Sequence, residues 1–411
     1  MTTSSATLSS SAAAPAEIAI GTWVGRVFLP GVGPAVVYVH NGLAHDITAY
    51  VATISALFDM ADPVAFLRAV PLGAPLASVA ELLANSDPAT RDSALPWPLA
   101  PIDLQAIKAA GVTFAASMVE RVVEEQAKGD PSAADGIRRS LMAEIGTDLS
   151  TIVPGSDESA RLKALLTARG LWSQYLEVGL GPDAEIFTKA QPLSAVGSGA
   201  EVGIHPKSHW NNPEPEIVLL VSSAGHIVGA TLGNDVNLRD FEGRSALLLG
   251  KAKDNNASTA IGPLVRLFDE TFSLDDVRAA DVELRVEGLD GFVMEGVSSI
   301  SKISRDPADL VGQTISRMHQ YPDGFALFLG TMFAPTKERA KENGVGGGGF
   351  THKPGDIVAI HSPKLGTLIN RVTYSDVAPE WQVGARALFA NLAQRGLLGV
   401  ACLPEDGRAL G

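Results

Sequence analysis

Residues 212–221 are Asn-Pro-Glu-Pro-Glu-Ile-Val-Leu-Leu-Val, and residues 232–240 are Leu-Gly-Asn-Asp-Val-Asn-Leu-Arg-Asp. Glu214 and Glu216 are two positions apart, so on an extended backbone both side chains leave the same face. The apolar stretch after them predicts a buried strand. Residues 222–225 are typical of a turn and residues 226–232 of a second strand, which together predict a hairpin. Counting back from that turn places Asp235 near the two glutamates.

Three carboxylates this close together predict a site for a hard divalent cation. Buried like charges repel each other and lose hydration unless a cation compensates them. An all-oxygen set that needs no His or Cys favours Mg²⁺, with Mn²⁺ as the other possibility, over Zn²⁺. Spacing alone leaves one alternative open, in which residues 213–216 are a solvated entry to an edge strand and Asp235 caps a turn.

Further sequence blocks give the chain a resemblance to a known family. They are Gly-Asn-Asp-Val-Asn-Leu-Arg-Asp at 233–240, Gly-Lys-Ala-Lys at 250–253 running to Ile-Gly-Pro at 261–263, Leu-Gly-Thr at 329–331, Lys-Pro-Gly-Asp-Ile-Val at 353–358 and Leu-Gly-Thr-Leu-Ile-Asn at 365–370. In order and spacing this set resembles the fumarylacetoacetate hydrolase family over roughly residues 105–375. The resemblance implies an α+β fold with a mostly β catalytic domain, a rolled mixed sheet around the metal, usually presented by a dimer.

The resemblance also implies site residues. The family's metal ligands correspond to Glu214, Glu216 and Asp235, in agreement with the count along the hairpin. Lys189 matches a recurrent family lysine, and Lys253 matches the lysine that lies over the metal-bound substrate. Arg239 and its neighbour Asp240 match an Arg-Asp pair that either faces the substrate or forms a scaffold ion pair.

One departure from the family pattern concerns the water-activating helix. Family hydrolases commonly carry an aromatic residue, a histidine and a glutamate there, whereas residues 114–120 are Phe-Ala-Ala-Ser-Met-Val-Glu. Ser117 replaces the histidine, and a serine hydroxyl is no base near pH 7 without help. Hydrolysis is therefore disfavoured, unless the helix is misaligned and His205 or His209 supplies the base.

Within the family, the lyases that dehydrate 2-keto-3-deoxy sugar acids fit best, on the blocks at 170–177, 208–216 and 250–258. This resemblance implies a Mg²⁺-dependent dehydratase of oxidative pentose breakdown that converts 2-keto-3-deoxy-D-pentonate to 2,5-dioxopentanoate. Loss of a C3 proton would form an enolate, and the C4 hydroxyl would leave. Two alternatives are an acylpyruvate-type carbon-carbon hydrolase and a scaffold protein with a structural cation.

Such a dehydration needs a base near C3 and an acid near the C4 hydroxyl. Lys253 is the candidate for the C3 proton, provided that burial and the cation lower its pKa, and Glu120 is the candidate for the hydroxyl. Ser117 is expected to belong to the catalytic residues and to orient the substrate. Asn255, Asn256 and Thr331 are expected to orient the substrate as part of the substrate-binding set, which also includes Lys189 and Arg239. Each of these four polar residues could instead satisfy a turn or a strand end.

Composition excludes several classes of protein. The formal net charge of -14 disfavours nucleic acid and anionic membranes as partners. A single cysteine, Cys402, excludes an intramolecular disulfide framework, and no apolar run approaches the roughly 20 residues of a membrane helix. The first 25 residues contain no Lys or Arg, so we expect no secretory signal and a cytoplasmic enzyme. The expected assembly is a homodimer or homotetramer.

The order of elements along the chain predicts three regions. Residues 1–17 are expected to be a flexible tail, residues 18–101 a small N-terminal α+β domain, and residues 102–411 the catalytic domain. A hairpin around Asn41-Gly42 opens the second region, and the Pro-rich stretch 96–101 is expected to be a linker. Helices are expected at 103–126, 138–168 and 383–398, with a surface loop at 336–349.

Overall fold

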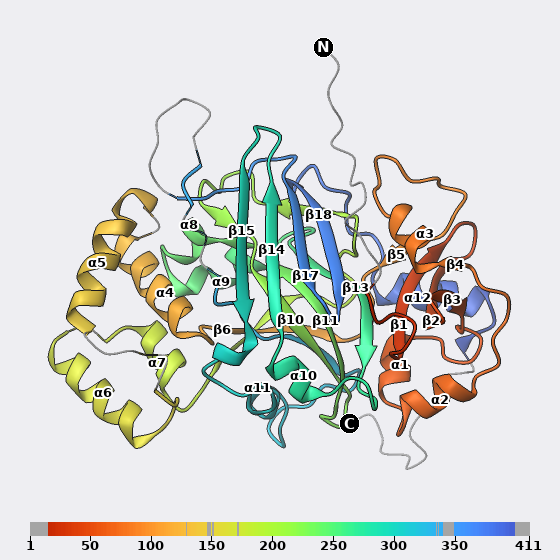
Figure 1. Cartoon of the computed structure of the whole chain (residues 1–411), viewed down its shortest axis with the longest axis horizontal. Coiled ribbons are helices and arrows are strands. Elements are labelled where there is room, and N and C mark those ends of the chain that lie inside the picture. The colour runs from red at the N-terminus through yellow and green to blue at the C-terminus, as the bar shows by residue number, and fades with distance from the viewer. Residues whose placement is uncertain are drawn as a thin grey trace.

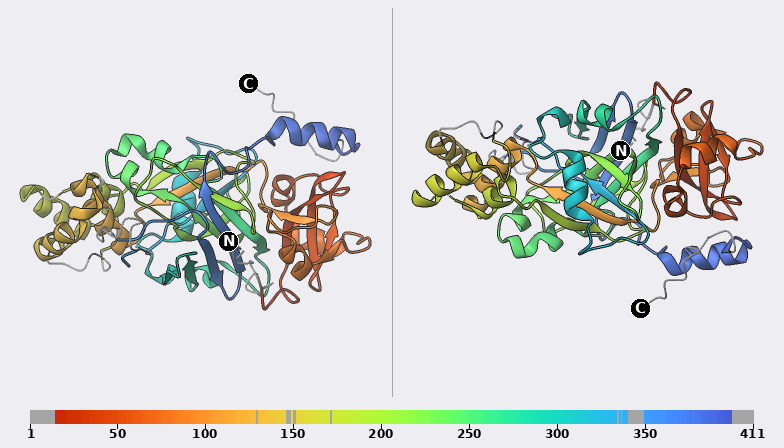
Figure 2. Two further views of the ribbon diagram at one scale, coloured as in Figure 1. Left: turned by 90° about the horizontal axis from the view of Figure 1, so that it is seen from above. Right: turned by 90° about the horizontal axis from the view of Figure 1, so that it is seen from below.

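The computed structural model describes residues 15–128, 130–145, 149, 152–170, 172–333, 335, 337–339 and 349–398. Two large β-sheets form its centre, a helical group lies at one end, and the N-terminal strands lie at the other (Figures 1 and 2). Buried side chains from both sheets form one core that includes Ile217, Leu219, Leu284 and Leu368. The mostly β, mixed-sheet architecture expected from the sequence is confirmed.

The larger sheet has eleven strands and carries the hairpin. In spatial order its strands are β4 (Ala77–Ser78), β3 (Leu43–Asp46), β2 (Gly33–His40), β1 (Trp23–Leu29), β13 (Thr259–Leu267), β11 (Ile227–Asp235), β10 (Pro215–Val221), β16 (Phe325–Phe328), β6 (Ala106–Gly111) and β7 (Glu185–Ala190), with β5 (Trp97–Leu99) paired to β1. Only β16 and β6 pair in parallel among these strands. All seven residues of β10 are buried, as expected for a strand covered on both faces.

The second sheet packs against the first. Its strands, in spatial order, are β15 (Val293–Ser299), β14 (Asp281–Glu287), β17 (Ile357–Ser362), β18 (Gly366–Tyr374) and β8 (Glu201–Ile204). Strand β14 alternates strictly between exposed charged residues and buried Val282, Leu284 and Val286, so one face meets the core and the other meets water. A two-stranded sheet of β9 (Asn211–Asn212) and β12 (Asn237–Leu238) flanks the hairpin.

Four helices form the helical group, and their own buried cluster includes Met118, Val122, Leu166 and Leu176. They are α4 (Ala115–Ala127), α5 (Ala134–Ile145), α6 (Asp157–Ala168) and α7 (Gln174–Leu180). The predicted helix 103–126 was wrong in its first half, because residues 106–111 form β6 between β16 and β7. Alternating apolar residues in that segment match a strand as well as a helix, and pairing with two neighbours decides for the strand.

The remaining helices are short. They are α1 (Ile54–Phe58), α2 (Pro63–Ala69), α3 (Val79–Ala84), α8 (Arg239–Glu242), α9 (Leu249–Lys253), α10 (Leu274–Arg278), α11 (Pro307–Thr314) and α12 (Ala385–Gln394), with 3₁₀ turns η1 (Pro131–Ala133), η3 (Ala246–Leu248) and η4 (Ile300–Lys302). In the part of the chain that the structure describes, no helix is both long and apolar enough to cross a membrane.

The N-terminal strands continue the large sheet. The hairpin at Asn41-Gly42 is confirmed, since β2 and β3 pair across it. The stretch 96–101, expected to be a linker, contains β5, which pairs with β1. Strand β1 in turn pairs with β13. The domain boundaries at 17 and 101 stay predictions, and the expected tail and the loop 336–349 fall largely outside the described residues.

Candidate metal centre

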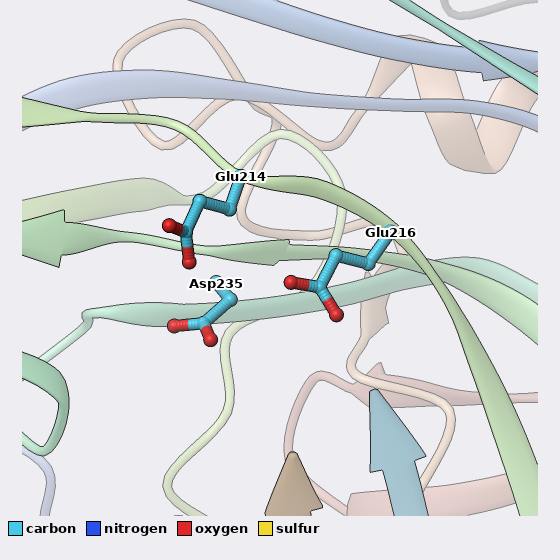
Figure 3. Close-up of side chains that lie close together, drawn as sticks. All are labelled: Glu214, Glu216 and Asp235. Atoms are coloured by element: carbon cyan, nitrogen blue, oxygen red, sulfur yellow. The ribbon is translucent and has the colours of Figure 1, made fainter. Parts of the chain in front are cut away.

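The β10–β11 hairpin brings the three predicted metal ligands together. Glu216 pairs with Gly233 in the ladder, and the Asp235 N–H donates to the Glu214 carbonyl over 3.0 Å. One carboxylate oxygen from each of Glu214, Glu216 and Asp235 lies within 4.8 Å of the others, and all three residues are buried. Figure 3 shows the three carboxylates converging from neighbouring strands. The predicted same-face placement of Glu214 and Glu216 is therefore confirmed.

The protein compensates this group of charges only in part. Burial, and then the charges of Asp235 and Glu214, raise the pKa of Glu216 well above its usual range. Its Oε2 accepts one hydrogen bond from the Gly330 N–H, at 2.6 Å. Asp235 Oδ1 is buried and accepts no hydrogen bond from any described residue, although the Lys189 ammonium lies 3.2 Å away. This crowded set of hard oxygens suits a divalent cation of the Mg²⁺ type.

Two lysines support the carboxylates. Lys253 Nζ lies 2.5 Å from Glu214 Oε2 and 2.9 Å from Asp235 Oδ2. Burial lowers the pKa of Lys253, but Asp235 and Glu214 outweigh it and the pKa is raised. The expected depression requires a bound cation and stays a prediction. Lys189 is fully buried and donates to the Lys253 and Ser258 carbonyls. Lys253 is thus a cation in this arrangement, and Lys189 fixes its backbone.

Arg121 is a third cation at the centre, and the sequence analysis missed it. From α4, its buried guanidinium contacts Glu214 Oε1, Glu124 Oε2 and Glu242 Oε2, each at 2.7 Å. Burial opposes ionisation of Glu214, but Lys253 and Arg121 outweigh it and lower its pKa. Arg121 stands next to the predicted Glu120 in sequence, yet only the fold brings it to Glu214.

Glu120 takes part in a separate ion-pair network. Arg138 holds both of its carboxylate oxygens, at 2.5 and 2.8 Å, and Arg239 lies 3.2 Å from Oε2. Burial raises the pKa of Glu120, but these two guanidinium groups outweigh it and the pKa is lowered. Arg239 also binds Glu124 at 2.6 Å. Glu120 is therefore an anion with its charge already compensated, a poor proton donor near neutral pH.

Glu185 has the opposite character. It lies on β7, partly buried, directly across from Gly111 on β6. Burial raises its pKa, and the nearby cations Arg121 and Lys253 offset this only in part. A raised pKa makes a carboxylate a stronger base than an ordinary glutamate. The sequence analysis missed Glu185, whose only signal was its place at the start of the strand that carries Lys189.

A cavity of about 570 Å³, including its opening to solvent, joins these groups. Among the described residues, seven carboxylates and three cationic side chains line it, a formal excess of four negative charges. Its charged lining is Glu120, Arg121, Glu124, Glu185, Glu214, Glu216, Asp235, Arg239, Glu242 and Lys253. A negative cavity with clustered oxygens attracts a cation, and the cationic wall attracts an anionic organic ligand.

Comparison with known proteins places this centre in a family. Residues 176–373, which contain all three carboxylates and both lysines, match the family described as fumarylacetoacetate (FAA) hydrolase C-terminal. Over this region the chain is similar to the C-terminal domain of that family. The chain is 31% identical over 188 residues to 2-dehydro-3-deoxy-D-arabinonate dehydratase of Saccharolobus solfataricus, a match that covers 46% of this chain and 58% of the relative. It is 29% identical over 199 residues to a probable 2-keto-3-deoxyxylonate dehydratase of Haloferax volcanii, covering 48% and 63%. The matches thus span less than two thirds of either relative.

Solved structures agree with this fold. A 2-keto-3-deoxy-D-arabinonate dehydratase in its apo form superposes with a TM-score of 0.59 at 22% identity, covering 86% of this chain and 99% of the other. The structure described as that dehydratase complexed with magnesium and 2,5-dioxopentanoate gives a TM-score of 0.58 at 22% identity, again covering 86% and 99%. The fumarylacetoacetate hydrolase fold expected from the sequence is confirmed.

Two of the other predicted residues line the cavity, and two do not. Ser117 and Thr331 line the cavity, although the Ser117 hydroxyl donates to the Phe114 carbonyl at 2.8 Å. Among the residues that the structure describes, Asn255 and Asn256 do not line the cavity. The Asn255 amide donates to the backbone carbonyl of residue 251, and the Asn256 amide donates to those of residues 375, 378 and 379. These four hydrogen bonds are typical of asparagines that stabilise loops.

The family's Arg-Asp pair is divided between two networks. Arg239 lines the cavity, with its guanidinium 4.2 Å from the centre of the Trp210 ring. Asp240 instead accepts from the Ser208 hydroxyl and the His209 N–H, both at 2.8 Å. Asp240 therefore holds the loop before β9, and its partners Ser208 and His209 differ from those of Arg239.

Proposed function

We propose that this chain is a hydro-lyase that converts 2-keto-3-deoxy-D-pentonate to 2,5-dioxopentanoate with Mg²⁺, or Mn²⁺, as its cofactor. The observation that carries the proposal is the buried set of three carboxylate oxygens within 4.8 Å, beside the cationic side chains of Lys253 and Arg121. The names of the two relatives and the magnesium and product in the similar structure support this choice of substrate and metal. Glu214, Glu216 and Asp235 would hold the cation, which would polarise the keto group and make the neighbouring C3–H more acidic.

The reaction combines the loss of water with several proton transfers. One proton leaves C3 and the hydroxyl leaves C4, which forms a C3=C4 double bond. A proton then leaves C5 and one returns to C3, and the resulting C4=C5 enol tautomerises to the aldehyde. The net change is loss of one water, so no oxidant or reductant is needed.

Lys253 and Glu185 are the pair that suits these steps. Lys253 lies as a cation against Glu214 and Asp235, so it is suited to stabilise the negative charge that develops on the substrate. Glu185 has a raised pKa and lines the same cavity, so it is suited to accept the C3 proton. Glu185 thus takes the C3 proton that was first assigned to Lys253. Glu120 has no role in this assignment, because Arg138 and Arg239 compensate its charge.

The hydrolase alternative lacks the histidine that family hydrolases commonly use to activate water. No histidine is found among the described residues that line the cavity, whereas Ser117, which the resemblance aligns with the family's histidine, is among them. His205 and His209, the possible substitutes, are absent from that lining as well. A serine hydroxyl bound to a backbone carbonyl does not activate water near pH 7.

Turnover tests the proposal directly. Purified protein with Mg²⁺ and 2-keto-3-deoxy-D-pentonate should form a semialdehyde that an aldehyde dehydrogenase couples to NAD reduction. Glu214→Ala should abolish this signal, whereas Glu283→Ala, which removes an exposed carboxylate from β14, should leave it intact. Oxalate should bind only when Mg²⁺ is present. Equal or faster turnover of an acylpyruvate, or full activity after exhaustive chelation, would overturn the assignment.

The cytoplasmic location and the homodimer or homotetramer stay predictions. Asn255 and Asn256 also stay predictions as substrate contacts, although their amides donate to backbone carbonyls.

A further inference from the structure

Two asparagines lie immediately beside the carboxylate centre. Asn212 ends β9, two positions before Glu214, and Asn237 begins β12, two positions after Asp235. The two residues pair directly across the antiparallel β9–β12 ladder. A spacing of two places each amide on the same side of its extended segment as the neighbouring carboxylate, roughly 6.6–6.8 Å further along. The amide pair therefore extends the row of carboxylates by one step.

Both carboxamides have hydrogen-bonding groups that the protein does not satisfy. The Asn212 Nδ2 donates to the Pro213 carbonyl at 2.9 Å, and this contact fixes which end of the amide is oxygen. Its Oδ1 accepts nothing from residues 15–398 as far as they are described, and the same holds for both Nδ2 and Oδ1 of Asn237. The two residues are 2% and 0% exposed. Buried polar groups without partners are uncommon in folded proteins, and each one is destabilising.

The position and chemistry of the pair point to a hydroxyl group. Asn212 lines the cavity that contains Glu214 and Asp235, and Asn237 lies opposite it. A hydroxyl donates one hydrogen bond and accepts others. Asn212 Oδ1 offers the acceptor and Asn237 Nδ2 offers the donor. A carboxylate would not suit this position, because the Asn212 oxygen would face another acceptor.

We propose that Asn212 and Asn237 form a subsite for the C5 hydroxyl of the sugar acid. The inference rests on the proposed function, because the keto acid end of the substrate must lie at Glu214, Glu216 and Asp235. The remote hydroxyl then extends one step along the row of side chains, toward the two amides. This pair selects acids that carry a terminal hydroxyl over acids that end in a methyl group.

Binding of two unreactive acids tests the subsite without relying on turnover. 5-Hydroxy-2-oxopentanoate and 2-oxopentanoate differ only in the C5 hydroxyl, and neither has a C4 hydroxyl to lose. Their dissociation constants are measured by calorimetric titration of the full chain with Mg²⁺. The fraction of the hydroxy acid in its cyclic form is the same for every variant, so it cancels when variants are compared.

Asn212→Leu and Asn237→Leu should each reduce the preference for the hydroxy acid by roughly 10- to 100-fold, with little change for 2-oxopentanoate. Asn211→Leu is the matched control, because Asn211 is buried on the same strand but its amide is bonded to Ser208 and to the His352 N–H. Asn212→Ser replaces the leucine variant if that variant does not fold.

Three outcomes separate the possibilities. Loss of preference in the Asn212 and Asn237 variants, but not in the control, supports the subsite. A preference within twofold of wild type in both variants overturns it, and the amides then bind only internal water. Failure of both acids to bind wild-type protein with Mg²⁺ refutes the proposed function itself, and the subsite with it.

Discussion

The Gly111→Ala substitution tests whether Glu185 takes part in the chemistry without deleting it. Gly111 lies opposite Glu185 in the β6–β7 pair, and a Cβ atom at this glycine would lie 2.1 Å from Glu185 Oε2 and 2.7 Å from its Cδ. Since contacts this short do not occur, the carboxylate must move by about 1 Å or more. A displacement of that size from a reacting geometry lowers turnover by roughly 10²-fold.

The same change should have little effect on folding. The obstructing atoms belong to the end of a flexible side chain, whose displacement costs about 0.5–1.5 kcal/mol. Alanine is about 0.5–1 kcal/mol more favourable than glycine within a strand. The free energy of unfolding should therefore stay within about 1 kcal/mol of wild type, as measured by urea denaturation.

The assay compares kcat/KM in the coupled NAD reaction for Gly111→Ala, Glu185→Gln and the double variant. Gly312→Ala in α11, where a Cβ meets open space, is the control. The double variant should be no slower than Glu185→Gln alone, because the two changes act through one carboxylate. Wild-type activity in Gly111→Ala, or an additional loss in the double variant, would refute the role of Glu185.

Three further predictions concern the groups around the carboxylates. Arg121→Met leaves Glu214 and Glu242 without their shared guanidinium, so the free energy of unfolding should fall by about 3–5 kcal/mol. The surface control Arg278→Met should lower it by no more than about 1 kcal/mol. Equal losses for the two variants in urea denaturation would contradict this reasoning. Burial raises the pKa of Glu242 to about 7, so the folded state binds an extra proton above pH 4.5 and wild-type stability falls as pH rises toward 7. Relative to Glu242→Gln, that fall should reach about 3 kcal/mol between pH 4.5 and 7, and parallel stability curves for the two proteins would exclude it. Ser117→Ala should change kcat/KM by less than about tenfold, because the hydroxyl is bonded to the backbone of its own helix start; a loss above a hundredfold would place Ser117 in the chemistry.

The sequence predicted the carboxylate centre because its geometry is local. Glu214 and Glu216 lie at the start of one strand, and the turn at residues 222–226 brings Asp235 back beside them, so periodicity and turn chemistry suffice. The start of α4 could not be found in the same way. Residues 106–111 become a strand because β16, more than 200 positions later, pairs with them.

The charges and pKa shifts around the site could not be predicted from the sequence for a related reason. Arg121 reaches Glu214 across 93 positions of the chain, and Glu185 gains its raised pKa from burial beside a wall assembled from several elements. The pKa of Lys253 depends on the sum of burial and two carboxylate charges, and the sign of that sum follows only from distances. Residue types indicate which groups can titrate, whereas the surroundings of each group determine the direction in which its pKa shifts.

The pairing of Trp23 and Val24 with Arg266 and Val265 constrains any attempt to shorten this protein. Strand β13 lies between β1 and the strand that carries Asp235. A gene product that began at residue 102 would leave one side of β13 with unpaired N–H and C=O groups, and such exposed strands promote aggregation. Engineers who want a minimal catalyst should therefore retain the leading strands, or cap that border with a substitute.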